Sequence, residues 1–516
     1  MVEKSLDHRE RRCYHTNNSY TLLSWSASLQ LAGAVMYIGI DLGSSAVKAV
    51  AVDETGACVA SHSRPLTIYR GPGGQAEHRP ADWESEAGAC LRALTEELGK
   101  QGHVPAAIAA TGQMDGPVLL DAHLRPVAPV QMWCDARCAA QCEDIESRIP
   151  AQKLLQITGH SAVTGYTAPK LMWFAEHEPE VLTRSAHLIF PKDYLTLLLS
   201  GTVGSDISDA SNSLLLDVRS GSWDESIVSA LGLDSVNLPD LSRSADVVGH
   251  VSRQGAEWSG LPPGIPVAAG AGDSIAAALG AGLTDSSRLQ IVVGSAGNVN
   301  CVLDRPIIDS RGRVHTGFFV DSEHWICTGV LQSAGASIQW WSDVLDMPLD
   351  EMVAEVEGVG PSGVFFAPYL AGERTPHLDA RVRGGFVALE GSTSRADMTR
   401  AVLNGVACSF RDAAQVFAEL GVHANEISIT GGAARNETIC RLIANVMQKS
   451  LTRIDADVTA MGAAMLAACA AGRFLSWQDA AAAWPASGEV FAPENAAIHE
   501  EAYQQFRRLY PRLAGW

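Results

Sequence analysis

The chain has little positive charge. Its 516 residues carry 38 lysines and arginines against 58 aspartates and glutamates, a formal net charge of -20. Such a balance disfavours a surface that follows the phosphates of a nucleic acid or lies on anionic lipid. We therefore expect no nucleic-acid partner and no membrane partner. An anionic substrate would need a local basic pocket.

Long apolar runs are also lacking. No uninterrupted run reaches the roughly 20 residues of a spanning helix. Residues 1–35 hold early arginines and a semi-apolar stretch, but acidic residues and serines interrupt the pattern of a signal peptide. Because Met36 stands directly before an apolar run, we interpret 1–35 as an extension that is disordered or lies upstream of the true start. We expect a cytoplasmic protein, with access to nucleotides.

The eleven cysteines form no close-spaced even framework, so no disulfides are expected. Cys134, Cys138 and Cys142 have the spacing of one helix face. They lack the Cys-x-x-Cys pairs or histidines of common metal sites. Ordinary buried thiols are therefore favoured over a metal centre.

Two glycine-serine turns, one in each half of the chain, are the most informative feature that is present. Gly43-Ser-Ser follows the apolar run Tyr37–Leu42, and Gly294-Ser-Ala-Gly297 follows 289–293. Glycine lets such a turn approach a phosphate, and backbone N–H groups and serine hydroxyls donate to its oxygens. One turn alone is more often an ordinary hairpin. Their repetition predicts a duplicated nucleotide-binding fold.

The rest of the chain alternates apolar runs with helical patterns, which is typical of an α/β protein of two large domains. The hydrophobic content of 47% is ample for two cores. We place the domain boundary near 283–289. Helices are predicted over 83–98, 151–157, 168–176, 274–279, 396–420, 436–447 and 460–471, and strands over 107–111, 118–120 and 427–430.

Six motifs occur in a characteristic order: Asp41-Leu-Gly-Ser-Ser, Gly112-Gln-Met, Trp133-Cys-Asp-Ala-Arg137, Gly272-Asp273, Gly372-Glu-Arg-Thr-Pro376 and Gly431-Gly-Ala-Ala-Arg435. With them, residues 37–475 resemble the FGGY carbohydrate kinases, and within that family the branch that acts on xylulose. Further matching stretches are Tyr166-Thr-Ala-Pro-Lys170, Pro191-Lys-Asp-Tyr194, Ser208-Asp209-Ala-Ser211 and Ser333-Ala-Gly335.

The resemblance implies an actin-like, ribonuclease-H-like pair of α/β domains with the active site in the cleft between them. It places a sugar-binding and metal/phosphate domain at 37–285, a nucleotide-binding domain at 286–475 and a C-terminal tail at 476–516. The implied reaction is phosphorylation of a ketopentose by ATP with Mg²⁺, with D-xylulose as the leading acceptor. The sequence leaves the oligomeric state open, a homodimer included.

Two aspartates are the candidates for carboxylate chemistry. Asp41 ends a strand beside Gly43 and Ser44, where it could hold Mg²⁺ directly or through water. By resemblance, Asp273 is the base that accepts the proton of the sugar hydroxyl. The alternatives are a turn-capping role for Asp41 and a helix N-cap for Asp273.

The resemblance implies nucleotide contacts in three segments. The first turn would contribute phosphate donors, and so would the second, which has one hydroxyl fewer than the family's usual Gly-Thr-Ser-Gly. The loop after 427–430 would cradle adenosine, although a plain αβ connection is the alternative. The residues implied are Gly43, Ser44, Ser45, Gly294, Ser295, Gly297, Gly431, Gly432, Ala433 and Asn436.

Sugar recognition is expected from Gln113, Met114, Asp115, Trp133, Asp135, Arg137 and Ser274. Two of these depart from the family's xylulose branch, because Asp115 stands where histidine is usual and Ser274 where asparagine is usual. A carboxylate accepts hydrogen bonds where a histidine can donate, so both departures bear on substrate choice. Glu77 matches a family loop over the sugar. The stretch Glu373–His377 is interpreted as a structural turn, and the aromatic pairs 340–341 and 365–366 as core.

Three alternatives remain open. The acceptor could be another ketose or a polyol. Actin-like folds also serve as nucleotide switches, in which ATP drives conformational change. A sugar-binding regulator without catalysis is the third, although the presence of Asp41 and Asp273 argues against it. The Gly112-Gln-Met stretch separates a kinase from a switch, because a switch has no need of a sugar pocket.

Overall fold

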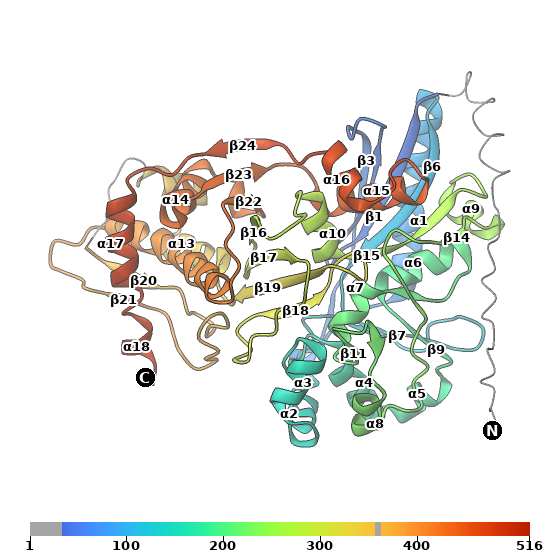
Figure 1. Ribbon diagram of the computed structural model, residues 1–516, viewed down its shortest axis with the longest axis horizontal. Helices are drawn as coiled ribbons and strands as arrows, with labels where there is room; N and C mark the ends of the chain where they lie inside the picture. Colours follow the sequence, from blue (N-terminus) through green and yellow to red (C-terminus); the bar gives the residue numbers. More distant parts are fainter. Residues whose placement is uncertain (1–32, 357–362, 516) are drawn as a thin grey trace, which may run out of the picture.

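Each glycine-serine turn joins the first two strands of its own sheet (Figure 1). The computed structural model describes residues 33–356 and 363–515. In it, β1 (Val35–Leu42) and β2 (Ala46–Val52) pair antiparallel around the first turn. Likewise β16 (Arg288–Val293) and β17 (Gly297–Leu303) pair around the second. Both predicted hairpins are confirmed. Of the expected extension, 1–32 lies outside the described residues, and Val35 already belongs to β1.

The two sheets share one plan. In spatial order the first sheet is β3 (Cys58–Pro65), β2, β1, β6 (Val104–Gly112), β15 (Pro266–Gly272) and β14 (Val247–His250). The second is β18 (His315–Phe318), β19 (Trp325–Leu331), β17, β16, β22 (Glu426–Thr430), β23 (Ser450–Ile454) and β24 (Gly488–Phe491). In the first sheet, β1 pairs parallel with β6, and β6 pairs parallel with β15. In the second sheet, β16 pairs parallel with β22 in the same way, and β22 pairs parallel with β23. The predicted duplication is thus visible in strand order and direction.

Helices cover both faces of the first sheet, which explains why its central strands are nearly continuous apolar runs. One face packs against α1 (Pro80–Gln101) and α6 (Pro191–Ser200), and α9 (Arg253–Ser259) packs on these two helices. The other packs against α10 (Asp273–Gly280) and α15 (Val458–Ala470), with α16 (Trp477–Ala483) against α15. Helix α15 therefore closes a sheet that belongs to the other half of the chain.

Small residues let α15 approach both β1 and α10 closely. A Cβ added at Gly39 of β1 would lie 2.1 Å from the Ala460 carbonyl oxygen, and one at Gly462 would lie 1.9 Å from the Ala276 carbonyl oxygen of α10. No larger side chain fits at either position. In Figure 1, α10 and α15 lie between the two sheets.

A separate core forms between β6 and β15 in the sequence. Its elements are β7 (Val118–Leu120), α2 (Ala139–Arg148), α3 (Ala151–Thr158), α4 (Thr167–His177), α5 (Pro179–Arg184), β9 (His187–Ile189) and α8 (Glu225–Leu231). Because α2 begins after Cys138, the expectation that Cys134, Cys138 and Cys142 share one helix face is wrong. The turn before α2 sets the first two thiols outside the helix.

Short elements complete the first half: β4 (Tyr69–Arg70), β5 (Ala76–His78), β8 (Val130–Gln131), β10 (Ser205–Asp206), α7 (Ile207–Ala210), β11 (Leu216–Asp217), β12 (Ser222–Trp223) and β13 (Leu241–Ser242). The second half adds α11 (Gly335–Leu345), α12 (Leu349–Ala354), β20 (Phe365–Ala367), β21 (Gly385–Val387), α13 (Arg395–Glu419), α14 (Glu437–Met447), α17 (Ala496–Phe506) and α18 (Tyr510–Leu513).

The last forty or so residues connect both halves. Strand β24 extends the second sheet, and α17 packs on α14. Trp484 donates its indole N–H to the Glu54 carbonyl oxygen of the first half at 3.2 Å. Trp341 and Phe366 are buried in the second core, as predicted, and Trp340 stacks on Phe366. Across the described ranges, no helix is long and apolar enough to cross a membrane.

Candidate active site

A cavity of about 340 Å³ lies at the carboxyl ends of β16, β22 and β23. This edge is where open α/β sheets usually bind ligands. Gly431 and Gly432 line it. Gly431 has φ 103°, and a Cβ there would lie 2.6 Å from the Val293 carbonyl oxygen, so only glycine fits. Ala433 does not line the cavity, and the Asn436 side chain caps α14 by accepting from Thr438 N–H at 3.1 Å.

The second turn is held by its own carbonyl groups. The Gly294 oxygen accepts from Gly335 N–H at 2.8 Å, and the Ser295 oxygen accepts from Ala334 N–H at 3.0 Å. The Ser295 side chain is exposed. At Gly297 a Cβ would lie 2.8 Å from the Phe410 ring, so the turn packs directly on α13. This anchoring leaves the outer side of the turn facing solvent.

The first turn carries a buried carboxylate. Asp41 lies opposite Lys48 in the hairpin, and its Oδ1 is buried without a hydrogen-bond partner among the described residues. Burial raises the pKa of Asp41 well above its usual value, and the charges of Asp273 and Asp457 raise it further. Ser45 is exposed, whereas the Ser44 hydroxyl accepts from the Trp133 indole N–H at 2.9 Å.

Asp457 connects this turn to the first cavity. It lines the cavity, caps α15 by accepting from Ala460 N–H at 3.2 Å, and pairs with Lys48 at 2.5 Å. The ion pair joins the hairpin of the first half to the start of a helix of the second half. Our sequence interpretation missed Asp457, although an aspartate directly before a helical pattern is a capping signal.

Asp273 is the first residue of α10, and Gly272 is the N-cap. The carboxylate accepts from the adjacent Ser274 N–H at 2.6 Å, but it does not cap the helix. The alternative N-cap role is therefore wrong. Burial raises the pKa of Asp273 to about 6.

Gln113, Met114 and Asp115 follow the end of β6, and Met114 contacts α10. The Met114 sulfur accepts from the Ser274 hydroxyl at 3.2 Å. His78 Nδ1 lies 2.8 Å from the Gln113 amide nitrogen and accepts from the Trp83 indole N–H, so the ring proton is on Nε2. Gln113 Oε1 and His78 Nε2 are buried without partners among the described residues.

Asp115 is strained and buried. Its φ is 73°, a left-handed conformation that disfavours most side chains, and its Oδ1 has no partner in the described chain. Burial raises the pKa of Asp115 to about 7, against the opposing charge of Lys170. The Lys170 ammonium donates to the carbonyl oxygens of Asp115 at 3.3 Å and Tyr166 at 3.1 Å, and it also contacts Gly165. Lys170 thus positions the Asp115 backbone.

Asp209 is a further candidate that our sequence interpretation did not assign. Both of its carboxylate oxygens are buried, and neither has a partner among the described residues. Burial raises its pKa well above the usual value, and the charges of Asp193, Asp206 and Asp115 raise it further while Lys192 opposes them. The only signal in the sequence was the stretch Ser208-Asp209-Ala-Ser211, which carried no residue role.

Asp135 and Arg137 form an ion pair with each other. Their side chains pair at 2.7 Å, and the same guanidinium pairs with Glu77 at 2.7 Å. Asp135 also accepts from Ala76 N–H at 2.8 Å. Trp133, by contrast, is 52% exposed and reaches the first turn. The structure brings Asp41, Asp115, Ser274 and Asp273 into one region and places Asp135 and Arg137 in its supporting wall.

Known proteins match the chain along most of its length. Models of the FGGY family of carbohydrate kinases match its N-terminal domain at 36–280 and its C-terminal domain at 289–471. A xylulose kinase of Lactococcus lactis is 34% identical over 92% of this chain and 96% of the relative. A xylulose kinase of Escherichia coli is 32% identical over 93% and 99%. The crystal structure of a xyloylose kinase from Brucella ovis superposes with a TM-score of 0.88 at 31% identity, covering 93% and 99%.

Proposed function

Because the chain belongs to the FGGY family of carbohydrate kinases and has its actin-like two-domain fold, we propose that it transfers the γ-phosphoryl group of ATP to D-xylulose, giving D-xylulose 5-phosphate. One observation carries the proposal. Buried polar atoms of Gln113, Asp115 and Asp209 have no protein partner in the described chain, and the carboxylate of Asp273 lies close enough to Asp115 for its charge to raise the pKa of that group. Buried polar groups are almost always satisfied, so a ligand rich in hydroxyls is the natural partner.

Asp273 acts as the general base. With a pKa of about 6 it is ionised at neutral pH yet basic enough to take a proton as the hydroxyl attacks. From the first position of α10, its charge acts on both Asp41 and Asp115, so it lies between the first turn and the polar residues after β6. The donors of the two turns and the cavity at Gly431 and Gly432 would hold the phosphates and the adenosine of ATP.

The residues present fit a magnesium ion supplied with the nucleotide. Among the described residues no three histidine, cysteine or acidic side chains are grouped to hold a metal by themselves. Mg²⁺ is usually held by one or two carboxylates together with phosphate oxygens and water. The unpartnered Oδ1 of Asp41 is the carboxylate available here. When bound, the ion offsets the charge of the phosphates.

Sugar hydroxyls are bound by Gln113, Asp115 and Ser274, with Met114 and Trp133 as walls. Asp135 and Arg137 support this site by fixing the segment that holds Glu77. With a pKa of about 7, Asp115 can accept from a hydroxyl when ionised and donate when protonated. This dual capacity, together with Ser274, favours a second candidate function, in which the acceptor is another ketose or a polyol.

An acceptor screen tests the function. ATP consumption is measured with D-xylulose, other ketopentoses, ketohexoses and pentitols, and we expect kcat/KM to be highest for D-xylulose. A ketohexose or polyol with a higher kcat/KM would refute D-xylulose as the preferred acceptor. ATP hydrolysis that no acceptor stimulates would refute a sugar kinase and support a nucleotide switch.

The variant Asp115→His tests the role of this carboxyl group. It restores the residue usual in the xylulose branch, and we expect it to change the ratio of kcat/KM between D-xylulose and the next best acceptor by about 10-fold or more. Asp121→His is the matched control, because Asp121 follows β7 outside the site and its carboxylate binds only residues of its own turn. An unchanged ratio in Asp115→His would remove Asp115 from substrate selection.

A further inference from the structure

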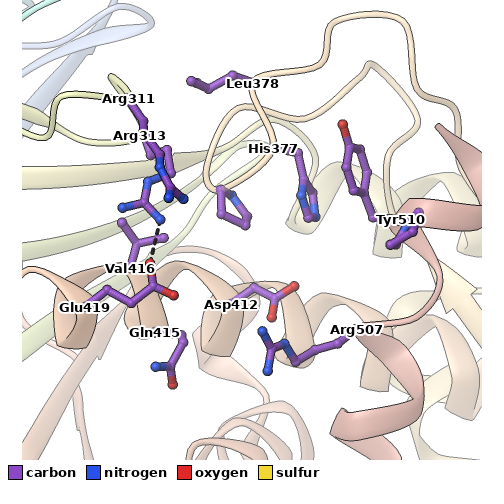
Figure 2. A pocket seen from close by; sticks show the side chains of 12 residues that line it. Arg311, Arg313, His377, Leu378, Asp412, Gln415, Val416, Glu419, Arg507 and Tyr510 are labelled. Atoms are coloured by element: carbon purple, nitrogen blue, oxygen red, sulfur yellow. Dashed lines mark hydrogen bonds and ion pairs between the residues drawn. The ribbon is translucent and has the colours of Figure 1, made fainter. Parts of the chain in front are cut away.

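A second cavity, of about 360 Å³, lies in the second half of the chain and shares no lining residue with the first (Figure 2). Four segments enclose it: helix α13, the loop residues 376–378 between β20 and β21, the turn at 311–313 and the C-terminal residues around Tyr510. None of these residues belongs to the kinase site described above. The cavity therefore needs its own explanation.

Its positive charge is available to a ligand. Arg313 is neutralised, since it pairs with Asp309 at 2.9 Å and with Glu419 at 2.6 Å, the latter drawn in Figure 2. Arg311 and Arg507 also line the cavity, and Arg507 faces Asp412, because its charge lowers the pKa of that carboxyl group (Figure 2). Two guanidinium groups on one cavity, neither of them held by a described residue in a close ion pair like that of Arg313, are suited to a phosphate.

The same cavity offers acceptors for hydroxyl groups. Asp412 is 8% exposed, and its Oδ1 accepts from the Tyr503 hydroxyl at 2.6 Å. Its Oδ2 accepts no hydrogen bond from a described residue, although the charges of Arg507 and Arg411 act on the carboxylate. Gln415 lies one helical turn further along α13 and also lines the cavity. His377 is not a third cation, because burial lowers its pKa to about 4 and its ring stacks on Tyr510 at 3.7 Å.

We propose that this cavity binds a small phosphate ester of a polyol or sugar. Its phosphate lies between Arg311 and Arg507, and its hydroxyls donate to Asp412 and Gln415. The Asp412 carboxylate disfavours ligands that carry further negative charge near their hydroxyls, so a polycarboxylate is excluded on electrostatic grounds.

Hydrogen bonds connect the cavity to the second phosphate turn. The Thr375 hydroxyl donates to the Arg313 carbonyl oxygen at 2.6 Å and accepts from Val330 N–H at 2.9 Å. Glu373 accepts from Gln332 N–H at 2.7 Å. Val330 lies near the end of β19 and Gln332 follows it, and the chain then leads to Ala334 and Gly335. The N–H groups of Ala334 and Gly335 donate to the carbonyl oxygens of Ser295 and Gly294. A ligand in the cavity is therefore expected to change the KM for ATP.

Calorimetry on the full chain tests the site. The protein is saturated with Mg²⁺ and a non-hydrolysable ATP analogue, so that the phosphate turns are occupied, and titrated with glycerol 3-phosphate, inorganic phosphate and glycerol. We expect glycerol 3-phosphate to bind more tightly than inorganic phosphate, and glycerol not to bind. Equal affinity for phosphate and its ester would overturn the role of Asp412 and Gln415.

Three variants locate the binding. Arg311→Ala and Arg507→Ala should each weaken glycerol 3-phosphate by about 10-fold or more, because each removes a charge-assisted contact. Arg508→Ala is the control, since Arg508 is exposed, lies next to Arg507 and does not line the cavity. An unchanged affinity in both cavity variants, or no binding by the parent chain, refutes the site. Because binding is measured without turnover, this result is independent of the sugar phosphorylated.

Discussion

The two glycine-serine hairpins have the same strand directions, but they carry different side chains at their turns. The first holds the half-buried Asp41 opposite Lys48, and the Oδ1 of Asp41 has no hydrogen-bond partner among the described residues. The second has no carboxylate at its turn and is anchored through its own carbonyl oxygens to Ala334 and Gly335. A duplicated backbone thus retains two phosphate-sized turns while only one copy carries charge. The comparison teaches that strand order reveals the duplication, whereas side chains decide what each copy does.

Asp273→Asn gives the largest expected effect, because it removes the proposed proton acceptor, which lies beside Asp41 of the first hairpin. General bases typically contribute 10²–10⁴-fold, so kcat for sugar phosphorylation should fall by about that factor. The KM for ATP should stay within about threefold, since the turns and the first cavity, rather than Asp273, are proposed to hold ATP. Steady-state kinetics measure both, and a kcat near that of the parent chain would refute Asp273 as the base.

Asp41→Asn tests the carboxylate of the first hairpin directly. We expect kcat/KM for Mg-ATP to fall by about 10–100-fold, the range typical of weakened metal sites. Asp53→Asn at the far end of β2 is the matched control, because its exposed carboxylate accepts only within its own turn. Equal activities of the two variants would mean that the first hairpin works through its backbone alone, like the second.

The pH profile sharpens the assignment of the base. Because burial raises the pKa of Asp273 to about 6, kcat/KM should fall below that pH by about 10-fold per unit as the carboxylate is protonated. Above it, this group causes no further change. The profile is measured with Mg-ATP saturating throughout, and an acid limb centred near the usual pKa of an exposed aspartate would contradict the assignment.

Ser295→Ala should have the smallest effect. The serine side chain is exposed, and the turn is positioned by backbone hydrogen bonds that the substitution leaves intact. We expect the KM for ATP to rise by less than about threefold. A rise comparable to that of Asp41→Asn would show that the second hairpin also depends on a side chain.

The hairpins and most helices were predictable because local patterns determine them. The helix predicted over 396–420 is α13 at Arg395–Glu419, and the one predicted over 436–447 is α14 at Glu437–Met447. Repeated apolar spacing and capping residues carry that information within a few turns of chain. The cysteine spacing misled us, because periodicity alone does not reveal where α2 begins.

The chemistry of the sugar site was only partly predictable. Motif order identified Asp115 and Ser274, but Lys170 and Asp209 draw their properties from burial among segments distant in sequence. The ion pair of Arg137 with Glu77 is likewise a tertiary contact, since Glu77 lies on β5, 60 residues earlier in the chain. The sequence gives the type of each side chain, whereas the completed fold decides which of its polar atoms lack a hydrogen-bond partner.

The crossing of α15 over the first sheet has a consequence for synthesis. Tyr37, Ala109 and Ala271 share their apolar cluster with Ala460, Ala464 and Ala467, which leave the ribosome much later. At translation rates of about 5–20 residues per second, that face of the nascent sheet waits on the order of tens of seconds for its cover. During this interval the apolar face of the sheet is exposed to aggregation. A polypeptide that ends before α15 would leave this apolar face uncovered.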